Sequence, residues 1–260
     1  MKHLKLPAWS PALLSIVFWV ALWWIVAAIF GKPLLLPTPP SALRALFSLA
    51  KTSSFYLTVF LSLLRIFLGI LLAMIAGVAL ALLTYRSRFF YHLFSPVLHL
   101  FKATPVASVI FLMLLWVGRN GVPFVIAFIM ALPIVWSNVN EGLDQTDIRL
   151  LEMARIFNVP PVKILQKIRI PSLMPYFLAA TRSSIAIAWK AGVAAEVLCT
   201  PERSIGRAIY EGKLYLLTDE LFAWTFVVVL ISVLIELLAL KLLNRPPYSS
   251  PLYRKEESKC

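Results

Sequence analysis

Long runs of apolar residues fill most of this chain and alternate with short polar connections. A helix of about 20 apolar residues is enough to cross the hydrocarbon core of a bilayer. Six segments approach that length, although the fourth is short and the third and fifth contain polar interruptions. They are residues 11–30, 57–84, 93–117, 122–136, 173–199 and 221–243. The pattern predicts an all-α polytopic membrane protein with about six transmembrane helices.

The connection between the first two runs has a helical pattern of its own. It opens with prolines at 37, 39 and 40, and Ser41 is then suited to be the N-cap of a short helix. The residues that share its apolar face are Leu43, Leu46, Phe47 and Ala50. We expect this amphipathic helix to lie at the outer surface of the membrane.

A basic segment separates the fourth and fifth runs. Residues 147–157 predict a helix with acidic Asp147 at its start and Arg155 near its end, which suits the helix dipole. The sequence Asn-Val-Pro-Pro at 158–161 then predicts a turn, because Asn tolerates the left-handed conformation and proline cannot continue a helix. A second helix begins at these prolines and ends before Ile170. Its basic residues are Lys163, Lys167 and Arg169.

Two functions fit such a helical hairpin. Leu151, Ala154 and Phe157 recur at helical spacing and predict a semi-apolar ridge that could dock into a groove on a soluble partner. Alternatively, the hairpin rests on the membrane surface and its basic side chains pair with lipid phosphates. The physical pattern alone favours neither.

Composition strengthens the membrane assignment. Hydrophobic residues make up 60% of the 260 residues and charged ones only 14%, whereas soluble domains have about 45–50% and 25%. The net charge of +13 reflects Lys and Arg at the cytoplasmic ends of spans rather than nucleic-acid binding, since no basic patch is interleaved with exposed aromatic residues. With a cytoplasmic N-terminus, basic residues fall inside about twice as often as outside. This predicts that both termini, the loop 138–170 and the polar tail 246–260 are cytoplasmic.

The basic segment also carries a recognisable motif. Glu152-Met153-Ala154, Asn158 and the Ile168–Pro171 stretch resemble the E-A-A-x3-G-x9-I-x-L-P loop of ABC-importer permeases, with Met, Asn and Ile at three positions. In that family the loop is a coupling helix that docks into a cleft on the ATPase subunit. The residues to which the resemblance assigns this contact are Glu152, Met153, Ala154, Arg155, Asn158 and Val159.

The resemblance extends over most of the chain. "SLLRIFLGILLAMIAGVALAL", "FKATPVASVIFLMLLWVG" and "AIAWKAGVAAEVL" resemble the second, third and fifth spans of permeases of the nitrate, sulfonate and taurine class. The resemblance implies a type I (MetI-like) permease domain over 1–245, with the coupling loop at about 141–172, in the cytoplasmic (inner) membrane of a prokaryote. It also implies two ATPase subunits, a second and identical permease copy, and an external solute-binding protein. ATP would be bound by the ATPase partners, so the permease needs no cofactor.

Charged and helix-breaking residues inside apolar runs are candidates for a transport pathway. Arg182 and Lys190 lie eight residues apart, about 12 Å along a helix axis, and could share a cationic pathway with Glu196 that suits an anion. They could equally hold the permease together through ion pairs. Arg65 is expected to extend to the membrane interface. The break formed by Thr104, Pro105 and nearby Ser108 could line a pore or only kink the helix.

The sequence gives little support to two other classes of function, an enzyme and an ion-coupled secondary transporter. The chain has no G-x-x-x-x-G-K-[ST] loop to bind ATP, and no H-E-x-x-H or Cys/His cluster that would indicate an enzyme. An ion-coupled secondary transporter would need acidic residues in the membrane, and Glu236 alone lies deep in an apolar run. A different substrate in the same ABC architecture, such as a pyrimidine, remains an alternative.

Overall fold

The computed structural model describes residues 10–32 and 34–243. The predicted tail 246–260 and the basic residues Lys2 and Lys5 lie outside the described residues. The described part is helical, without a strand, which confirms the all-α architecture. Its helices are α1 (Ser10–Phe30), α2 (Pro39–Ala50), α3 (Ser53–Arg86), α4 (Arg88–Ala103), α5 (Val106–Val117), α6 (Val122–Asp144), α7 (Ile148–Ile156), α8 (Pro161–Ile164), the π-helical η1 (Leu165–Arg169), α9 (Ile170–Cys199), α10 (Ile205–Leu214) and α11 (Thr218–Leu243).

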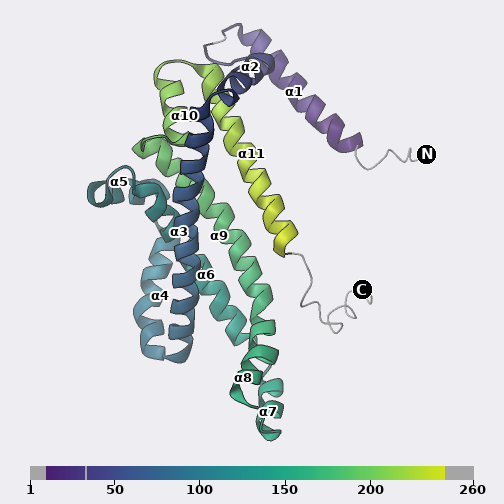
Figure 1. Cartoon of the computed structure of the whole chain (residues 1–260), viewed down its shortest axis with the longest axis vertical. Helices are drawn as coiled ribbons and strands as arrows, with labels where there is room; N and C mark the ends of the chain where they lie inside the picture. Colours follow the sequence, from purple (N-terminus) through teal and green to yellow (C-terminus); the bar gives the residue numbers. More distant parts are fainter. Residues whose placement is uncertain (1–9, 33, 244–260) are drawn as a thin grey trace, which may run out of the picture.

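Helices α3, α6 and α9 form the centre of the bundle, with α6 packed against both of the others (Figure 1). Their contact surfaces supply a core that includes Ile66, Val135 and Trp189. Small residues allow the close approach, as is usual between membrane helices. A Cβ atom at Gly69 would overlap the carbonyl oxygen of Phe124, so α3 and α6 pack backbone against backbone there.

Several helices are long and apolar enough to cross a membrane. By length and composition these are α3, α6 and α11 among the described residues, with a fourth span if the bent pair α4–α5 is counted as one. Helix α9 has 30 residues, about 45 Å of helix, which exceeds the roughly 30 Å of a bilayer core. It is less apolar because it carries Arg182, Lys190 and Glu196. The predicted second, fourth, fifth and sixth runs all fall within α3, α6, α9 and α11.

The third apolar run, 93–117, is broken at Thr104 and Pro105, where the sequence predicts a helix break. Helix α4 ends at Ala103, α5 begins at Val106, and their axes differ by 110°. Thr104 caps α4 in an extended conformation, and Pro105 has no N–H with which to continue the helical hydrogen bonds. The predicted break is therefore a sharp elbow of the chain between α4 and α5.

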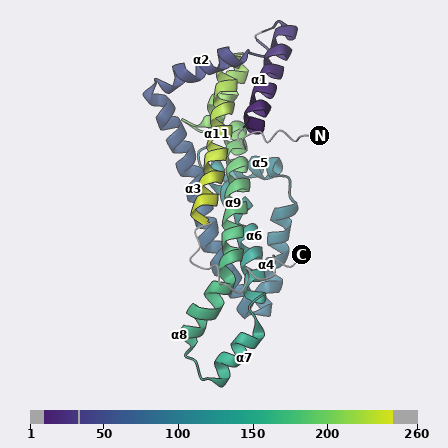
Figure 2. The same ribbon diagram turned by 90° about the vertical axis from the view of Figure 1, so that its right-hand side faces the viewer.

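The two ends of the bundle are built differently (Figure 2). We call the end that carries α7 and α8 the loop end and the opposite end, with α2 and α10, the α10 end. Helix α2 begins after Thr38, so the prediction that Ser41 is the N-cap is wrong; Ser41 lies in the first turn and its Oγ donates to the Thr38 carbonyl oxygen (2.8 Å). Proline is favoured at the first helical positions, so the helix begins at Pro39, two residues before Ser41. On the predicted apolar face, Leu46 packs on the core while Phe47 is exposed.

Candidate functional site

The helical hairpin at the loop end extends beyond the other helices (Figure 2). Its first helix, α7, is capped by Asp147, whose carboxylate accepts a hydrogen bond from the backbone N–H of Arg149 (2.8 Å). Asp147 thus satisfies one of the N–H groups that have no partner within a helix, and its charge suits the helix dipole. The start of α7 is therefore set by local sequence.

The predicted left-handed turn at Asn158 is confirmed. Asn158 has φ of 50°, and the amides on either side close the end of α7: Asn158 N–H donates to the Arg155 carbonyl (3.0 Å) and Val159 N–H to the Ala154 carbonyl (2.9 Å). This is the Schellman arrangement, in which the residue after the cap adopts the left-handed conformation. Pro161 then begins α8.

The second half of the hairpin differs from the prediction. It does not end before Ile170 but continues from α8 through the π-helical η1 directly into α9. Pro171 has no N–H for the regular ladder, and the wider turn of η1, closed by the Ile170 N–H on the Leu165 carbonyl, accommodates it. The hairpin is consequently attached to α9 by one continuous helix.

The predicted docking ridge does not face outward as a whole. Ala154 is buried, with 2% of its surface exposed, and Leu151 and Arg155 line a cavity of about 360 Å³ against Pro161, Ile164, Leu165 and Arg169. The outward surface of α7 instead presents Glu152 and Met153, together with Ile156 (76% exposed) and Phe157 (74%) at the tip. Ala154 is thus enclosed within the hairpin, whereas the apolar tip is exposed.

Arg182 and Lys190 lie in one pocket, as the sequence suggested. It has a volume of about 740 Å³ and is lined by facing sides of α9 and α11. Glu236 of α11 forms an ion pair with Arg182 (Nη2 to Oε1, 3.7 Å). Trp189 Nε1 donates to Ser232 Oγ (2.9 Å) and joins the two helices beside the pocket. The exposed ammonium of Lys190 has no hydrogen bond or ion pair to the residues that the structure describes.

Glu196 lies away from this pocket. Its side chain is fully buried where α3, α9 and α10 meet, and Oε2 accepts hydrogen bonds from Ser62 Oγ (2.8 Å) and Gly206 N–H (3.2 Å). Arg65, expected to extend to the membrane interface, reaches the loop between α9 and α10. Its Nη2 donates to the Glu202 carbonyl (2.7 Å), and its Nη1 lies 3.9 Å from Glu196 Oε1. We call Ser62, Arg65, Glu196 and Gly206 the Glu196 cluster.

The residues of the α4–α5 elbow are partly accessible. Thr104 is half-buried and its Oγ1 donates to the Leu100 carbonyl (2.7 Å), whereas Pro105 and Ser108 are exposed. Lys102, two residues before Thr104, donates from Nζ to Ser137 Oγ of α6 (3.0 Å). The elbow is thus fixed to α6 by a side-chain contact and does not adjoin the Lys190 pocket.

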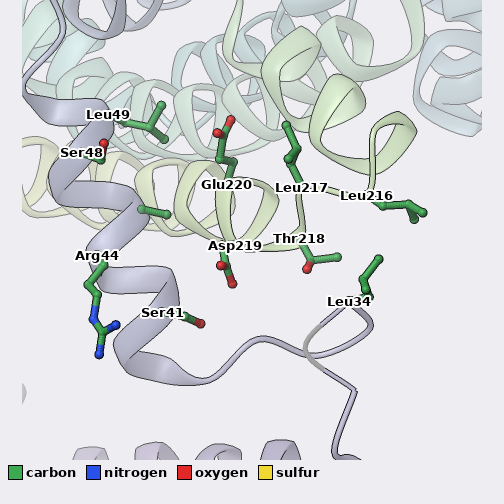
Figure 3. Close-up of a pocket in the computed structure, with 11 residues that line it drawn as sticks. Leu34, Ser41, Arg44, Ser48, Leu49, Leu216, Leu217, Thr218, Asp219 and Glu220 are labelled. Atoms are coloured by element: carbon green, nitrogen blue, oxygen red, sulfur yellow. The ribbon is translucent and has the colours of Figure 1, made fainter.

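A third cavity, of about 570 Å³, opens at the α10 end between α2 and the start of α11. Figure 3 shows Ser41, Arg44 and Ser48 on one side of it. Asp219 and Glu220 from the first turn of α11 stand on the other. Apolar residues, among them Leu34, Leu49 and Leu217, also line the cavity, so its walls are mixed, with an acidic pair on the α11 side.

The structure is a multi-pass helical bundle with a protruding hairpin at one end and a charged pocket between its membrane helices. This architecture is typical of a transport permease. The chain belongs to the family of binding-protein-dependent transport system inner membrane components, which matches residues 69–245. It is therefore a membrane component of an ABC importer for small solutes, and a transport subunit rather than an enzyme. Such permeases work with ATPase and binding-protein partners, so the secondary-transporter alternative is not retained.

Curated relatives resemble the chain over most of its length. A probable ABC transporter permease protein of Haemophilus influenzae is 28% identical over 213 residues, covering 81% of this chain and 86% of the relative. The nitrate import permease protein NrtB of Synechococcus elongatus is 29% identical over 210 residues (76% and 75%). The taurine transport system permease protein TauC of Escherichia coli is 24% identical over 226 residues (84% and 82%).

Sequence reasoning missed two features of the membrane region. It did not pair Glu236 with Arg182, although opposite charges in the fifth and sixth apolar runs were a usable signal. It also missed the roles of Ser62 and Gly206 in the Glu196 cluster. Neither residue stands out in a sequence, because a serine and a glycine are common in membrane helices.

Proposed function

We propose that this permease moves a small anionic solute, of the sulfonate, taurine or nitrate kind, inward across the cytoplasmic (inner) membrane of a prokaryote. Two identical copies surround one pathway. An external binding protein delivers the solute at the α10 end, and two ATPase subunits dock at the loop end. The loop end and both termini are cytoplasmic.

The charge of the pocket between α9 and α11 carries the substrate proposal. Arg182 and Glu236 offset each other, so Lys190 leaves the pocket with a net positive charge. A cation without a partner inside a membrane protein is costly unless it meets a ligand or a cavity. The volume of the pocket between α9 and α11, about 740 Å³, lies within the range of roughly 300–1,000 Å³ that is typical of small-molecule sites. The nitrate and taurine permeases among the relatives agree with a small solute that is an anion or carries an anionic sulfonate group.

The tip of the hairpin supports ATPase docking at the loop end. Ile156 and Phe157 expose 76% and 74% of their surface, next to charged Arg155 and, one turn back, Glu152. Exposed apolar side chains ringed by charges are typical of a protein interface. A hairpin made only to rest on lipid headgroups would not need the rigid Schellman turn that fixes this tip.

Uptake by the reconstituted transporter tests the substrate proposal. The complete complex, with its ATPase and binding protein, is placed in liposomes, and uptake of labelled taurine, an alkanesulfonate, nitrate and uracil is measured. We expect transport of nitrate or of one of the two solutes that carry an anionic sulfonate group. Lys190→Leu should slow that uptake by about 10- to 100-fold, since a hydrogen bond to a charged group contributes roughly 1.5–3 kcal/mol. Lys190→Arg should retain most of it.

The alternatives give different results. If Lys190→Leu prevents assembly while Lys190→Arg restores it, Lys190 has a structural role and the pathway assignment fails. Normal uptake by Lys190→Leu would remove Lys190 from both roles. Transport of uracil in preference to every anion would overturn the substrate class while leaving the family assignment intact.

A further inference from the structure

The Glu196 cluster supplies hydrogen-bond partners for the start of α10. The first N–H groups of a helix have no partner within it. Here Ile205 N–H donates to Ser62 Oγ (2.9 Å), Gly206 N–H to Glu196 Oε2 (3.2 Å), and Arg207 N–H to Ser204 Oγ (3.1 Å). Two of these three acceptors belong to α3 and α9. The start of α10 is therefore bonded to both helices rather than capped by its own residues alone.

Packing at the same point leaves no room for the start of α10 to move closer to α9. A Cβ atom at Gly206 would overlap the Cβ atom of Glu196 and the backbone nitrogen of Val197, so α10 rests directly on the backbone of α9. The carboxylate of Glu196 lies at the positive end of the α10 dipole, where a negative charge is favoured. Geometry and charge thus act together at one side chain.

The loop that joins α9 to α10 is held from two further sides. Thr200 and Arg203 both have φ of 48°, in the left-handed region that a β-branched residue such as threonine seldom adopts. Between them, the Glu202 carbonyl accepts from Arg65 Nη2 (2.7 Å) and its N–H donates to Asn120 Oδ1 (3.0 Å) in the turn before α6. These contacts with α3 and with that turn hold the loop in a conformation it would not keep alone.

Arg65 and Glu196 face each other without completing a contact. Arg65 Nη1 and Glu196 Oε1 are both buried and make no hydrogen bond to the part of the chain that the structure describes. Their separation of 3.9 Å is an ion-pair distance but exceeds a hydrogen bond. A movement of about 1 Å would close it. The cluster therefore has a closer arrangement available, in which Arg65 pulls on the loop that it already holds at Glu202.

We propose that Glu196 and Arg65 are positioning residues that transmit contact at the α10 end to the transport helices. Helix α10 connects α9 to α11, which form the two walls of the Lys190 pocket. The position of α10 therefore influences the position of α9 relative to α11. A partner that presses on α10 moves α9 through Glu196 and α3 through Arg65 and Ser62. The inference rests on the proposed assembly, in which the external binding protein is that partner.

ATP hydrolysis by the complete transporter in liposomes tests this, measured with and without the binding protein. The stimulation is the ratio of the ATP hydrolysis rate with the binding protein to the rate without it. Glu196→Gln keeps the size and hydrogen-bond acceptor but removes the charge that faces Arg65. We expect it to assemble normally and lose at least about fivefold in stimulation, the lower range of coupling between sites. Arg65→Lys should lose a similar factor, because one ammonium cannot reach both Glu202 and Glu196.

Two comparisons separate positioning from structural support. The double variant should lose no more than either single variant, because the two residues act as a unit. Thr225→Val removes an exposed hydroxyl of α11, outside α10 and the Glu196 cluster, that donates to the Leu221 carbonyl (2.8 Å), and it should leave stimulation unchanged. If Glu196→Gln does not assemble, Arg65→Lys decides the question.

Unchanged stimulation in variants that assemble, or reduced assembly with unchanged stimulation, overturns the inference while the proposed function stands. A wild-type transporter that its binding protein does not stimulate overturns the proposed assembly and this inference with it.

Discussion

Phe157→Ala at the tip of the hairpin is the most direct test of ATPase docking. Phe157 exposes 74% of its surface and follows the last residue of α7, next to Ile156. Truncation of so exposed a side chain should change the stability of the isolated permease by less than about 0.5 kcal/mol. A change in ATPase binding would therefore come from the interface itself.

The structure sets the size of the effect. A buried aromatic side chain covers about 150–250 Å². At 74% exposure, Phe157 has about 150 Å² left to bury, which at about 25 cal/mol per Å² is roughly 3.7 kcal/mol. Alanine would keep part of that contact. We expect a loss of about 2–3 kcal/mol, or about 30- to 140-fold in Kd.

Binding of the purified ATPase to the permease in nanodiscs measures this loss. Phe47→Ala is the matched control, because Phe47 is 67% exposed on α2 at the other end of the molecule. It should leave the Kd unchanged. An unchanged Kd for Phe157→Ala, or equal losses for both variants, would refute docking through the hairpin tip and leave lipid headgroups as its contact.

Two further predictions concern orientation and packing. A cysteine introduced as Asn158→Cys, in a chain with Cys199 and Cys260 replaced by serine, should react with an impermeant maleimide only after the cells are opened; labelling of intact cells would reverse the proposed topology. Gly69→Ala should cost about 1–3 kcal/mol as overpacking, because its Cβ atom would overlap the Phe124 carbonyl oxygen, and should lower the melting temperature of the purified permease. Ala79→Val on the exposed side of α3 is its control, and equal melting temperatures would contradict the packing argument.

Features that depend on neighbouring residues could be predicted from the sequence. The long apolar runs gave the helical membrane architecture, because backbone groups in lipid must be satisfied within the segment. The turn at Asn158 followed from the tolerance of Asn for the left-handed conformation and from the prolines behind it. The start of α7 at Asp147 followed from capping chemistry. Each is a local preference that no distant contact overrode.

Features at helix junctions were harder to predict. Thr104 and Pro105 indicated a break, but the 110° between α4 and α5 depends on what each helix packs against. Pro171 suggested the end of a helix, yet a π-helical turn absorbs it and the hairpin continues into α9. Proline removes one hydrogen bond, and the surrounding packing decides whether the helix bends, widens or ends there.

The sequence by itself determined the membrane class, the hairpin and which charged residues lie inside apolar helices. Only the tertiary structure decided their partners. Ser62 and Glu196, which are hydrogen-bonded, are 134 positions apart. Arg182 of α9 forms an ion pair with Glu236 of α11, whereas Lys190, also on α9, forms none with the described residues. Helical periodicity shows which residues share a face, but the rotation of each helix against its neighbours decides what that face contacts. That rotation comes from long-range packing, such as the close helix contacts at Gly69 and Gly206. Local sequence patterns do not predict such contacts.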